Sequence, residues 1–186
     1  MLKSMYLAGV GSQGLQVLGK TISAAANKKD YYVTYSPKYG AAKRGGLTSC
    51  YVVISDEPIG NPRRKKHDLV LAMEPSAYKN FRNDVKEGGN LIVNSTLVPE
   101  RMEPIGGIRE IPVPLHGVCM EIGNNKVISA VALGAVAELL EDMFPEKEDL
   151  LDAFLEALSE KPGLKEINER AFAGGNTAMK EILNNL

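Results

Sequence analysis

The sequence predicts an α/β fold in which helices cover both faces of a mostly parallel sheet. Three observations lead to this prediction. A glycine-rich turn joins an apolar segment to a helical pattern near the N-terminus. Strand and helix patterns alternate through the first half of the chain, which is typical of three-layer domains. Two predicted strands are almost wholly apolar without alternation, as in parallel sheets buried on both faces. We therefore expect a three-layer α/β/α, Rossmann-like domain.

Six strands are predicted, each from a short run of apolar, β-branched or aromatic residues. They cover Met5–Val10, Tyr31–Ser36, Leu47–Ser55, Asp68–Met73, Gly89–Asn94 and Ile108–Val113. A helix is expected over Gln13–Asn27, because apolar residues recur there at helical spacing, and another over Pro75–Val85.

The last third of the sequence is helical in pattern. Three helices are expected, over Asn125–Phe144, around Leu150–Leu158 and over Leu164–Leu186. A length of 186 residues fits one domain of ordinary size. Because we find no repeat and no long linker, we expect a single domain over residues 1–186. Its sheet portion would cover residues 1–124, and a helical C-terminal extension residues 125–186.

The composition is that of a soluble globular protein, with 44% hydrophobic and 24% charged residues. Cys50 and Cys119 cannot hold a four-cysteine iron–sulfur cluster within this chain, and they fit no metal spacing. We expect both to be buried, reduced thiols, which suits a cytoplasmic protein. No apolar run reaches the roughly 20 residues of a membrane span, and Met1–Tyr6 lacks the pattern of a signal peptide.

Charge is unevenly distributed along the chain. Residues 1–93 contain 14 Lys and Arg against 7 Asp and Glu, whereas residues 94–186 contain 8 against 16. One interpretation is that the first half faces an anion or an acidic partner. The other is that charge follows the element types, because the C-terminal helices are rich in Glu.

The strongest local motif is the Gly-x-Gly-x-x-Gly turn from Gly9 to Gly14. It follows a strand and opens a helix, which is the setting of a phosphate-binding turn. We take Gly9, Gly11, Ser12, Gln13 and Gly14 as candidate binding residues, since a helix N-terminus offers unpaired N–H groups. Alternatively, the glycines only pack the helix against the sheet. A dinucleotide site is not expected, because Tyr35 and Ser36 stand where an acidic residue would bind the ribose.

The segment Ser36–Gly46 combines glycines with Tyr39, Lys43 and Arg44. It should leave the same sheet edge as the glycine turn, so both could face one ligand or a partner chain. Arg44 is the best candidate for binding an anion, because its guanidinium can bind phosphate or carboxylate through two hydrogen bonds. Tyr39 and Gly45 complete this candidate set. The alternative is a turn with solvated charges.

Other chemistry-bearing residues are more isolated. The basic run Arg63–Lys66 is expected to be a solvated loop, and no nucleic-acid motif accompanies it. His67 and His116 belong to no triad or metal pattern, and His116 is expected in a rigid loop after the sixth strand. Asn94–Thr96 ends the fifth strand and could contribute polar groups to the same cleft. We name no catalytic residue and no metal ligand.

Taken together, the motifs resemble the gamma subunit of the 2-oxoacid:ferredoxin oxidoreductases. The matching pieces occur in order over most of the chain: Gly9–Gly14, Ser36–Gly46, Cys50–Ile59, Asp68–Met73, Gly88–Ser95 and the helix around Asn125–Leu140. Two departures affect the expected ligand geometry. Ser12 stands where the family usually has Gly, and Pro37-Lys38 precede Tyr39 where the family more often has Ser.

The resemblance implies a non-catalytic subunit of a heteromeric enzyme. Such an enzyme oxidatively decarboxylates a 2-oxoacid to an acyl-CoA and passes electrons to ferredoxin. Thiamine diphosphate, Mg²⁺ and the iron–sulfur clusters are then expected mainly on the alpha and beta partners, or on a ferredoxin-like delta subunit. This chain would hold no cofactor firmly, and it lacks the thiamine-binding Gly-Asp-Gly…Asn-Asn pattern. The glycine turn and the Arg44 segment would meet coenzyme A phosphates or the alpha subunit.

The Tyr-Gly…Arg-Gly-Gly form looks more like that of 2-oxoglutarate or branched-chain members than that of pyruvate members. Indolepyruvate enzymes use a similar domain and remain an alternative. A second alternative is a free-standing, Rossmann-like nucleotide-binding protein. An obligate subunit should expose a docking surface and associate when isolated, whereas a free-standing binder should be monodisperse and stabilised by a nucleotide.

Overall fold

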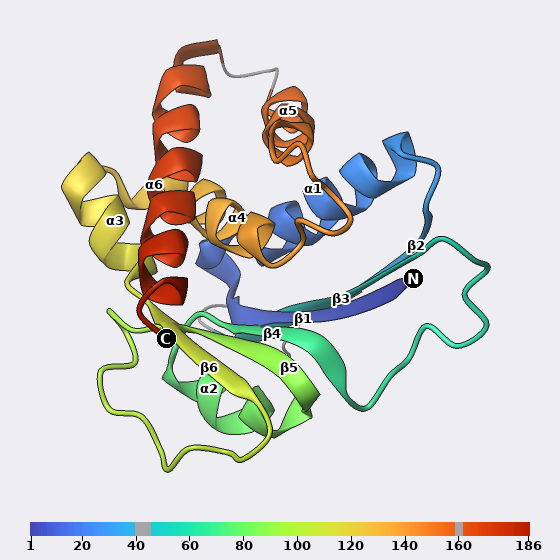
Figure 1. Cartoon of the computed structure of the whole chain (residues 1–186). Helices are drawn as coiled ribbons and strands as arrows, with labels where there is room; N and C mark the ends of the chain where they lie inside the picture. Colours follow the sequence, from blue (N-terminus) through green and yellow to red (C-terminus); the bar gives the residue numbers. More distant parts are fainter. Residues whose placement is uncertain (40–45, 159–161) are drawn as a thin grey trace.

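A computed structural model describes residues 1–39, 46–158 and 162–186. Six strands form one sheet in the order β2-β3-β1-β4-β5-β6, with helices on both faces (Figure 1). The strands are β1 Leu2–Val10, β2 Tyr32–Lys38, β3 Leu47–Ser55, β4 His67–Ala72, β5 Val85–Asn94 and β6 Arg109–Val113. The α-helices are α1 Leu15–Lys28, α2 Pro75–Phe81, α3 Leu115–Ile122, α4 Ile128–Glu138, α5 Glu148–Ala157 and α6 Lys165–Leu183. Short 3₁₀ turns cover Gly11–Gln13, Arg82–Asp84, Asn125–Val127 and Pro162–Leu164.

The sheet is mostly parallel, as predicted. Strands β1, β4, β5 and β6 pair in parallel, whereas β3 is antiparallel to both of its neighbours, β1 and β2. The reversal follows from chain connectivity. A short connection can join β2 to β3 only as antiparallel neighbours, whereas parallel neighbours need a longer crossover.

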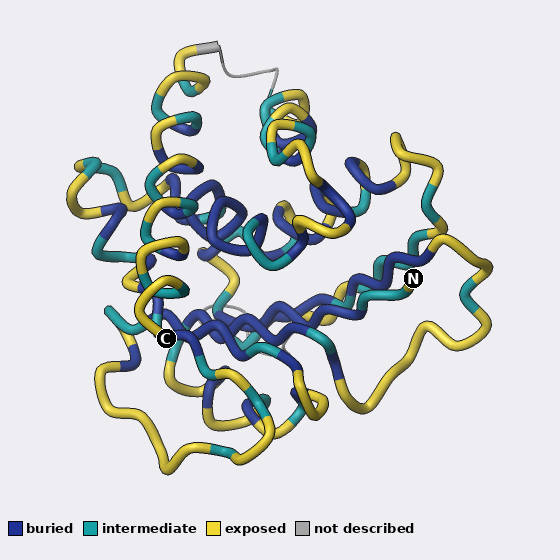
Figure 2. The backbone as a smooth tube through the Cα atoms, viewed as in Figure 1, coloured by how far each residue is buried: buried dark blue, intermediate teal, exposed yellow. Residues whose placement is uncertain are grey.

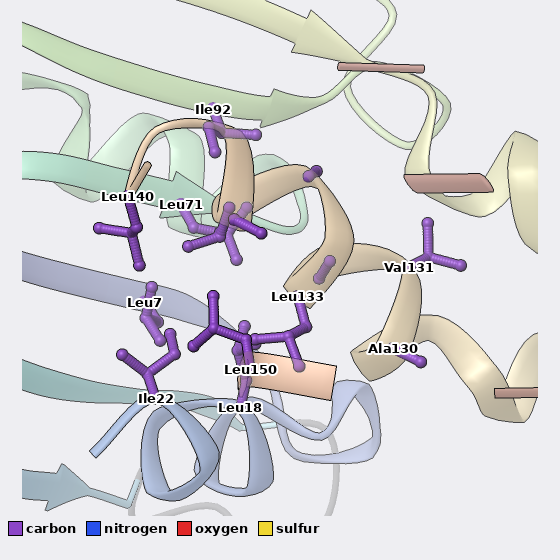
Figure 3. Close-up of a cluster of buried hydrophobic side chains, with 14 of the residues drawn as sticks. Leu7, Leu18, Ile22, Leu71, Ile92, Ala130, Val131, Leu133, Leu140 and Leu150 are labelled. Carbon is purple, nitrogen blue, oxygen red and sulfur yellow. The ribbon is translucent and has the colours of Figure 1, made fainter. Parts of the chain in front are cut away.

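Helices divide unequally between the two faces of the sheet (Figure 1). One buried cluster joins the sheet to α1 and to α3–α6, and a smaller cluster on the other face includes Ala77 and Tyr78 of α2. The four central strands, β1, β3, β4 and β5, are buried over most of their length, whereas the edge strands β2 and β6 are less buried (Figure 2). Figure 3 shows Leu7, Leu71 and Ile92 of three strands directed toward the α1 and α4 side. The three-layer α/β/α fold is therefore confirmed.

The helical C-terminal portion differs in detail from the prediction. The expected helix over Asn125–Phe144 begins with a 3₁₀ turn, and its α-helical part, α4, ends at Glu138. Helix α4 lies in the core and crosses α6 closely. A Cβ atom on Gly134 would overlap the carbonyl oxygen of Phe172, and one on Gly175 would overlap that of Val131. These two glycines let the helix backbones touch, so the C-terminal helices form part of the main core.

Helix α3 corrects the prediction that His116 lies in a rigid loop. Pro114 occupies the N-cap position of α3, and His116 lies in its first turn. The two prolines before His116 suggested a loop, but a proline at the start of a helix removes only an N–H group that would have no partner there. Gly123 ends the helix in the left-handed conformation, with φ of 81°.

Pro37 interrupts the free edge of β2. The Met73 amide donates to the carbonyl of Ala8, so even-numbered residues of β1 direct their backbone groups toward β4. The pairing of β1 with β3 and of β3 with β2 continues this alternation across the sheet. In β2, the even-numbered residues therefore direct their backbone groups toward β3, and Pro37 directs its backbone groups toward solvent. The N–H group that proline lacks is therefore one that would face the open edge, where proline is tolerated.

The opposite edge strand, β6, carries the same feature. The Ser95 amide donates to the carbonyl of Val113, so the odd-numbered residues of β6 face β5 and Pro112 faces outward. Prolines at both edges limit the pairing of this sheet with a strand from another chain. A partner of this protein is therefore expected to use its faces rather than its sheet edges.

Candidate functional site

The carboxyl ends of β1, β4, β5 and β6 meet at one edge of the sheet because these strands are parallel. The chain leaves β1 toward α1 on one face and leaves β4 toward α2 on the other. Open α/β sheets bind ligands at such a switch point, outside the carboxyl ends of the strands. The glycine turn lies at this point, between β1 and α1.

Two glycines of the turn are required by close packing. A Cβ atom on Gly9 would lie 2.8 Å from Cβ of Met73 and would overlap the side chain of Gln13. Gly14 has a left-handed φ of 69°, and a Cβ atom there would lie 2.8 Å from Cβ of Ser129 on α4. By contrast, Gly11 is exposed, and a Cβ atom there would have no heavy atom of the described residues within 4 Å.

Gln13 points inward, into the switch point. Its Oε1 accepts the Val10 amide at 2.8 Å, and its Nε2 donates to the carbonyl of Met73 at 3.4 Å. The side chain is buried and joins the turn to the end of β4. The surface that the turn presents therefore consists of Gly11 and Ser12, which are both exposed.

The N-terminus of α1 adds an electropositive end to this surface. Gly14 caps the helix without a side-chain hydrogen bond, and the first turn contains no acidic residue. The first amide groups of a helix have no partner within it and together carry a partial positive charge. Because α1 has 14 residues, this end suits an anion such as a phosphate group.

Strand β2 ends and strand β3 begins at the same edge of the sheet, as predicted. Val10 pairs with Leu47, and Lys38 pairs with Ser49, so β2 ends and β3 begins beside the glycine turn. Tyr39 follows β2 and is 72% exposed. Arg44 and Gly45 lie outside the described residues, and their place in the candidate set stays a prediction.

Gln16 binds the first turn of α1 to β2 and β3. Its Nε2 donates to the hydroxyl of Thr48 at 3.1 Å and to the carbonyl of Ser49 at 3.0 Å, and its Oε1 accepts the hydroxyl of Tyr35. Tyr35 stands where a ribose-binding acid would be expected, and its hydroxyl is directed at this glutamine instead. Sequence reasoning missed Gln16, because an amide on a helix carries no motif.

Asn94 connects the end of β5 to the same carbonyl that Gln13 contacts. Its Nδ2 donates to the carbonyl of Met73 at 2.9 Å and to Nδ1 of His116 at 2.8 Å, while its Oδ1 accepts the His116 amide. Nearby, the hydroxyl of Thr96 accepts the Gly117 amide at 3.0 Å. The polar residues at the end of the fifth strand therefore orient the first turn of α3.

This arrangement determines the protonation state of His116. Because Nδ1 accepts from Asn94, the ring proton resides on Nε2. Burial lowers the pKa of His116, and the accepted hydrogen bond favours the neutral ring as well. His116 therefore offers a neutral N–H donor at the end of the sheet where the glycine turn lies.

The remaining candidates have structural surroundings. Cys50 and Cys119 are buried, as expected, and burial raises their thiol pKa values to about 12 and about 11. His67 is buried against the rings of Tyr6 and Tyr51. Arg63–Lys66 is exposed in the loop between β3 and β4, as predicted.

Within residues 1–39, 46–158 and 162–186, His, Cys, Asp and Glu form no group of three or more that could hold a metal ion. In the same part of the chain, no helix has the length and apolar character needed to span a membrane.

Sequence comparison identifies the class that this fold and turn define. The sequence model of the family "Pyruvate ferredoxin/flavodoxin oxidoreductase" matches residues 4–178. The 2-oxoglutarate synthase subunit KorC of Methanocaldococcus jannaschii is 33% identical over 186 residues, which cover 98% of this chain and 96% of that protein. The chain belongs to the pyruvate ferredoxin/flavodoxin oxidoreductase family, as the sequence motifs indicated.

Solved structures agree with this assignment. The gamma subunit of a keto/oxoacid ferredoxin oxidoreductase from Geobacter sulfurreducens is 30% identical with a TM-score of 0.79, over 96% of this chain and 99% of that chain. The 2-oxoglutarate:ferredoxin oxidoreductase from Magnetococcus marinus, with 2-oxoglutarate, coenzyme A and succinyl-CoA bound, has a TM-score of 0.87. The match covers 97% of this chain and 31% of that chain. At 22% identity, it supports the fold alone.

Proposed function

We propose that this chain is the gamma subunit of a heteromeric 2-oxoacid:ferredoxin oxidoreductase, with the whole of residues 1–186 acting as one gamma-type domain. The complex would decarboxylate a 2-oxoacid oxidatively, join the acyl group to coenzyme A and reduce ferredoxin. The observation that carries the proposal is the family match over residues 4–178, together with a KorC relative of nearly equal length. That relative is a 2-oxoglutarate synthase subunit, so 2-oxoglutarate is the first substrate to test.

The chemistry of the complex is assigned to other chains. The described residues include buried thiols and isolated histidines, and none of these forms a catalytic pair. Thiamine diphosphate, Mg²⁺ and iron–sulfur clusters would be held by alpha and beta subunits, or by a ferredoxin-like delta subunit. This chain would contribute binding surface rather than a reacting group.

Within the complex, the glycine turn would receive phosphate groups of coenzyme A. Gly11 and Ser12 are exposed beside the N-terminus of α1, which has no side-chain cap. Gly9, Gln13 and Gly14 hold the turn in place by their packing and hydrogen bonds inside the protein. Tyr39, Arg44 and Gly45 belong to the connection that begins and ends at the same edge. We therefore expect substitutions at the exposed residues to change ligand affinity, and substitutions at the inward-facing residues to change the stability of the fold.

Kinetics with coenzyme A test this role. In the purified complex, Arg44→Gln should raise the KM for coenzyme A about tenfold, with little change in the KM for the 2-oxoacid. Exposed Lys79 on α2 provides the matched control as Lys79→Gln, which should leave both constants unchanged. An unchanged KM for coenzyme A together with intact assembly in Arg44→Gln would contradict the assignment of Arg44.

A free-standing nucleotide-binding protein remains the alternative to exclude. Such a protein would purify alone, as a monodisperse species whose Tm rises with a nucleotide. The proposed subunit would instead purify with thiamine-dependent partner chains. Mass spectrometry of the material captured by a tag on this chain distinguishes the two.

A further inference from the structure

A cationic cavity lies on the α2 side of the sheet, beneath β2 and β3. Its volume is about 490 Å³, and its lining includes Ser36, Lys38, Tyr51 and Pro62–Arg64. Helix α2 packs on the neighbouring strands β1 and β4 of the same face. Over β2 and β3, the cover comes from the loop that joins β3 to β4. We call Lys38 together with Arg63–Lys66 the basic patch.

Lys38 is held in position within the patch. Its ammonium group donates to the hydroxyl of Tyr51 at 2.7 Å and lies 4.5 Å from the centre of the Tyr51 ring. A cation over an aromatic face gains electrostatic attraction from the ring. Arg63 and Arg64 are exposed at the mouth of the cavity, where both guanidinium groups remain accessible.

Several other cations of the first half have acidic partners within the chain. Lys3, Lys28 and Lys29 form ion pairs with Asp142, Glu156 and Asp149, all of which belong to the acidic second half. Part of the positive charge of residues 1–93 is therefore neutralised by acidic residues of 94–186. Among the described residues, Lys38, Arg63 and Arg64 form no ion pair. Lys20 and Lys79 are also exposed without an ion pair in this part of the chain, but the basic patch brings several such cations together.

Nearby ionisable groups respond to this charge. Burial is the main cause that lowers the pKa of His67; the neighbouring Asp68 raises it, and the positive Arg64 and Lys38 lower it. Burial raises the pKa of Asp84, while Lys66 and Lys38 act in the opposite direction. Asp84 is thus a carboxyl group close enough to feel the charge of the patch, although it makes no ion pair with it.

The shape of the patch favours a polypeptide over a small ligand. Four consecutive cations, Arg63–Lys66, run along an exposed loop and extend beyond the lining of the cavity. Pro37 prevents continuous pairing along the neighbouring edge of β2, so recognition must come from side chains. Guanidinium and ammonium groups bind carboxylates through charge-assisted hydrogen bonds, and such complementarity directs association.

We propose that the basic patch docks an acidic segment of a neighbouring subunit, with its Asp or Glu side chains entering the cavity between Lys38 and Arg63–Arg64. This inference rests on the proposed function for its choice of partner, a chain of the same complex. It assigns the gamma subunit a docking face on the α2 side of the sheet, the face opposite α1.

Carbodiimide cross-linking of the purified complex tests the contact directly, because it joins lysine amines to touching carboxylates without a spacer. We expect cross-links from Lys38, Lys65 or Lys66 to Asp or Glu of another subunit. Lys38→Arg keeps the charge and should remove only the cross-link of that residue. Arg63→Glu with Arg64→Glu should weaken assembly at least tenfold, whereas Lys20→Glu with Lys79→Glu, two exposed lysines elsewhere, should not.

Three results would overturn the inference. The first is a complex that assembles normally in the Arg63→Glu, Arg64→Glu variant and yields no cross-link from the patch; it would leave the proposed function standing. The second is cross-linking only between copies of this chain, detected by isotope mixing. The third is a result in which millimolar pyrophosphate stabilises the isolated chain, and the Arg63→Glu, Arg64→Glu variant loses this stabilisation but still assembles normally. That result would show that the patch binds a small anion. If wild-type chain captures no subunit, the proposed function fails as well.

Discussion

Gln13 and Asn94 donate their side-chain amides to the same backbone carbonyl, that of Met73, at 3.4 and 2.9 Å. Gln13 comes from the glycine turn and Asn94 from the end of β5, and both are buried. A buried carbonyl can accept two hydrogen bonds, so this single oxygen joins the candidate ligand turn to the strand that orients His116. The buried side of the candidate site is therefore held together by the side-chain amides of Gln13 and Asn94 rather than by ion pairs.

Removing the Gln13 amide should destabilise the fold more than it affects ligand binding directly. In Gln13→Leu, the part-buried Val10 amide loses its acceptor, and an unpaired amide that is shielded from water costs about 1 kcal/mol or more. Urea denaturation of the full chain measures this loss. Ser12→Ala changes an exposed neighbour and should stay within about 0.5 kcal/mol of wild type. Equal stability of the two variants would contradict the inward role of Gln13.

His67 should make stability depend on pH. Its pKa is lowered to about 4, chiefly by burial, whereas in the unfolded chain it returns to about 6.5. Between these values the unfolded state binds more protons, so stability rises with pH and is lost on acidification from 6.5 toward 4. The expected loss is about 3 kcal/mol. His67→Phe retains a ring against Tyr6 and Tyr51 and should remove this part of the pH dependence, seen in Tm measured across pH.

The pKa of His116 should lie below the ordinary value for histidine, and its neutral ring should carry the proton on Nε2. Nitrogen NMR shifts of the ring identify the tautomer and the midpoint together. Asn94→Asp replaces the donor to Nδ1 by a carboxylate, which favours the imidazolium and should raise the pKa of His116. Asn80→Asp, an exposed change on α2, controls for added charge. A midpoint unchanged by Asn94→Asp would mean that the contact does not set the protonation state.

The crossing of α4 and α6 should tolerate no side chain at Gly134. Its Cβ atom would overlap the backbone oxygen of Phe172, and backbone cannot move aside as a flexible side chain can. Overpacking of this kind costs about 3 kcal/mol. Thermal unfolding of Gly134→Ala should show a large fall in Tm, whereas Gly60→Ala, with no heavy atom of the described residues within 4 Å of the added carbon, should be near wild type. Similar Tm values would contradict the close crossing.

Local patterns predicted the strands well because the sheet is buried and its strands have uniform composition. The third strand was predicted with the bounds that the structure has, Leu47–Ser55. Helix α3 was missed because Pro112 and Pro114 read as loop, although one faces an open edge and the other caps a helix. The helix over Asn125–Phe144 was predicted too long, because apolar composition continues past the end of α4 at Glu138.

The sequence predicted the location of the glycine turn but not the direction of its side chains. Glycine spacing located the turn, yet it could not tell that Gln13 points inward while Ser12 points outward, since that depends on the Met73 carbonyl from a distant strand. The sequence alone could not separate the two interpretations of the charge asymmetry, and an acidic partner for the first half stays a prediction. Lys28 and Lys29 pair with α5, while Arg63 and Arg64 face outward.

The most direct test of the central claim is reduction of a viologen dye by the complex that co-purifies with this chain, tagged in its native host. The assay compares 2-oxoglutarate, pyruvate, a branched-chain 2-oxoacid and indolepyruvate, each with and without coenzyme A. The account predicts reduction that requires both a 2-oxoacid and coenzyme A, fastest with 2-oxoglutarate. A chain that purifies alone, colourless and inactive with every acid, would contradict it.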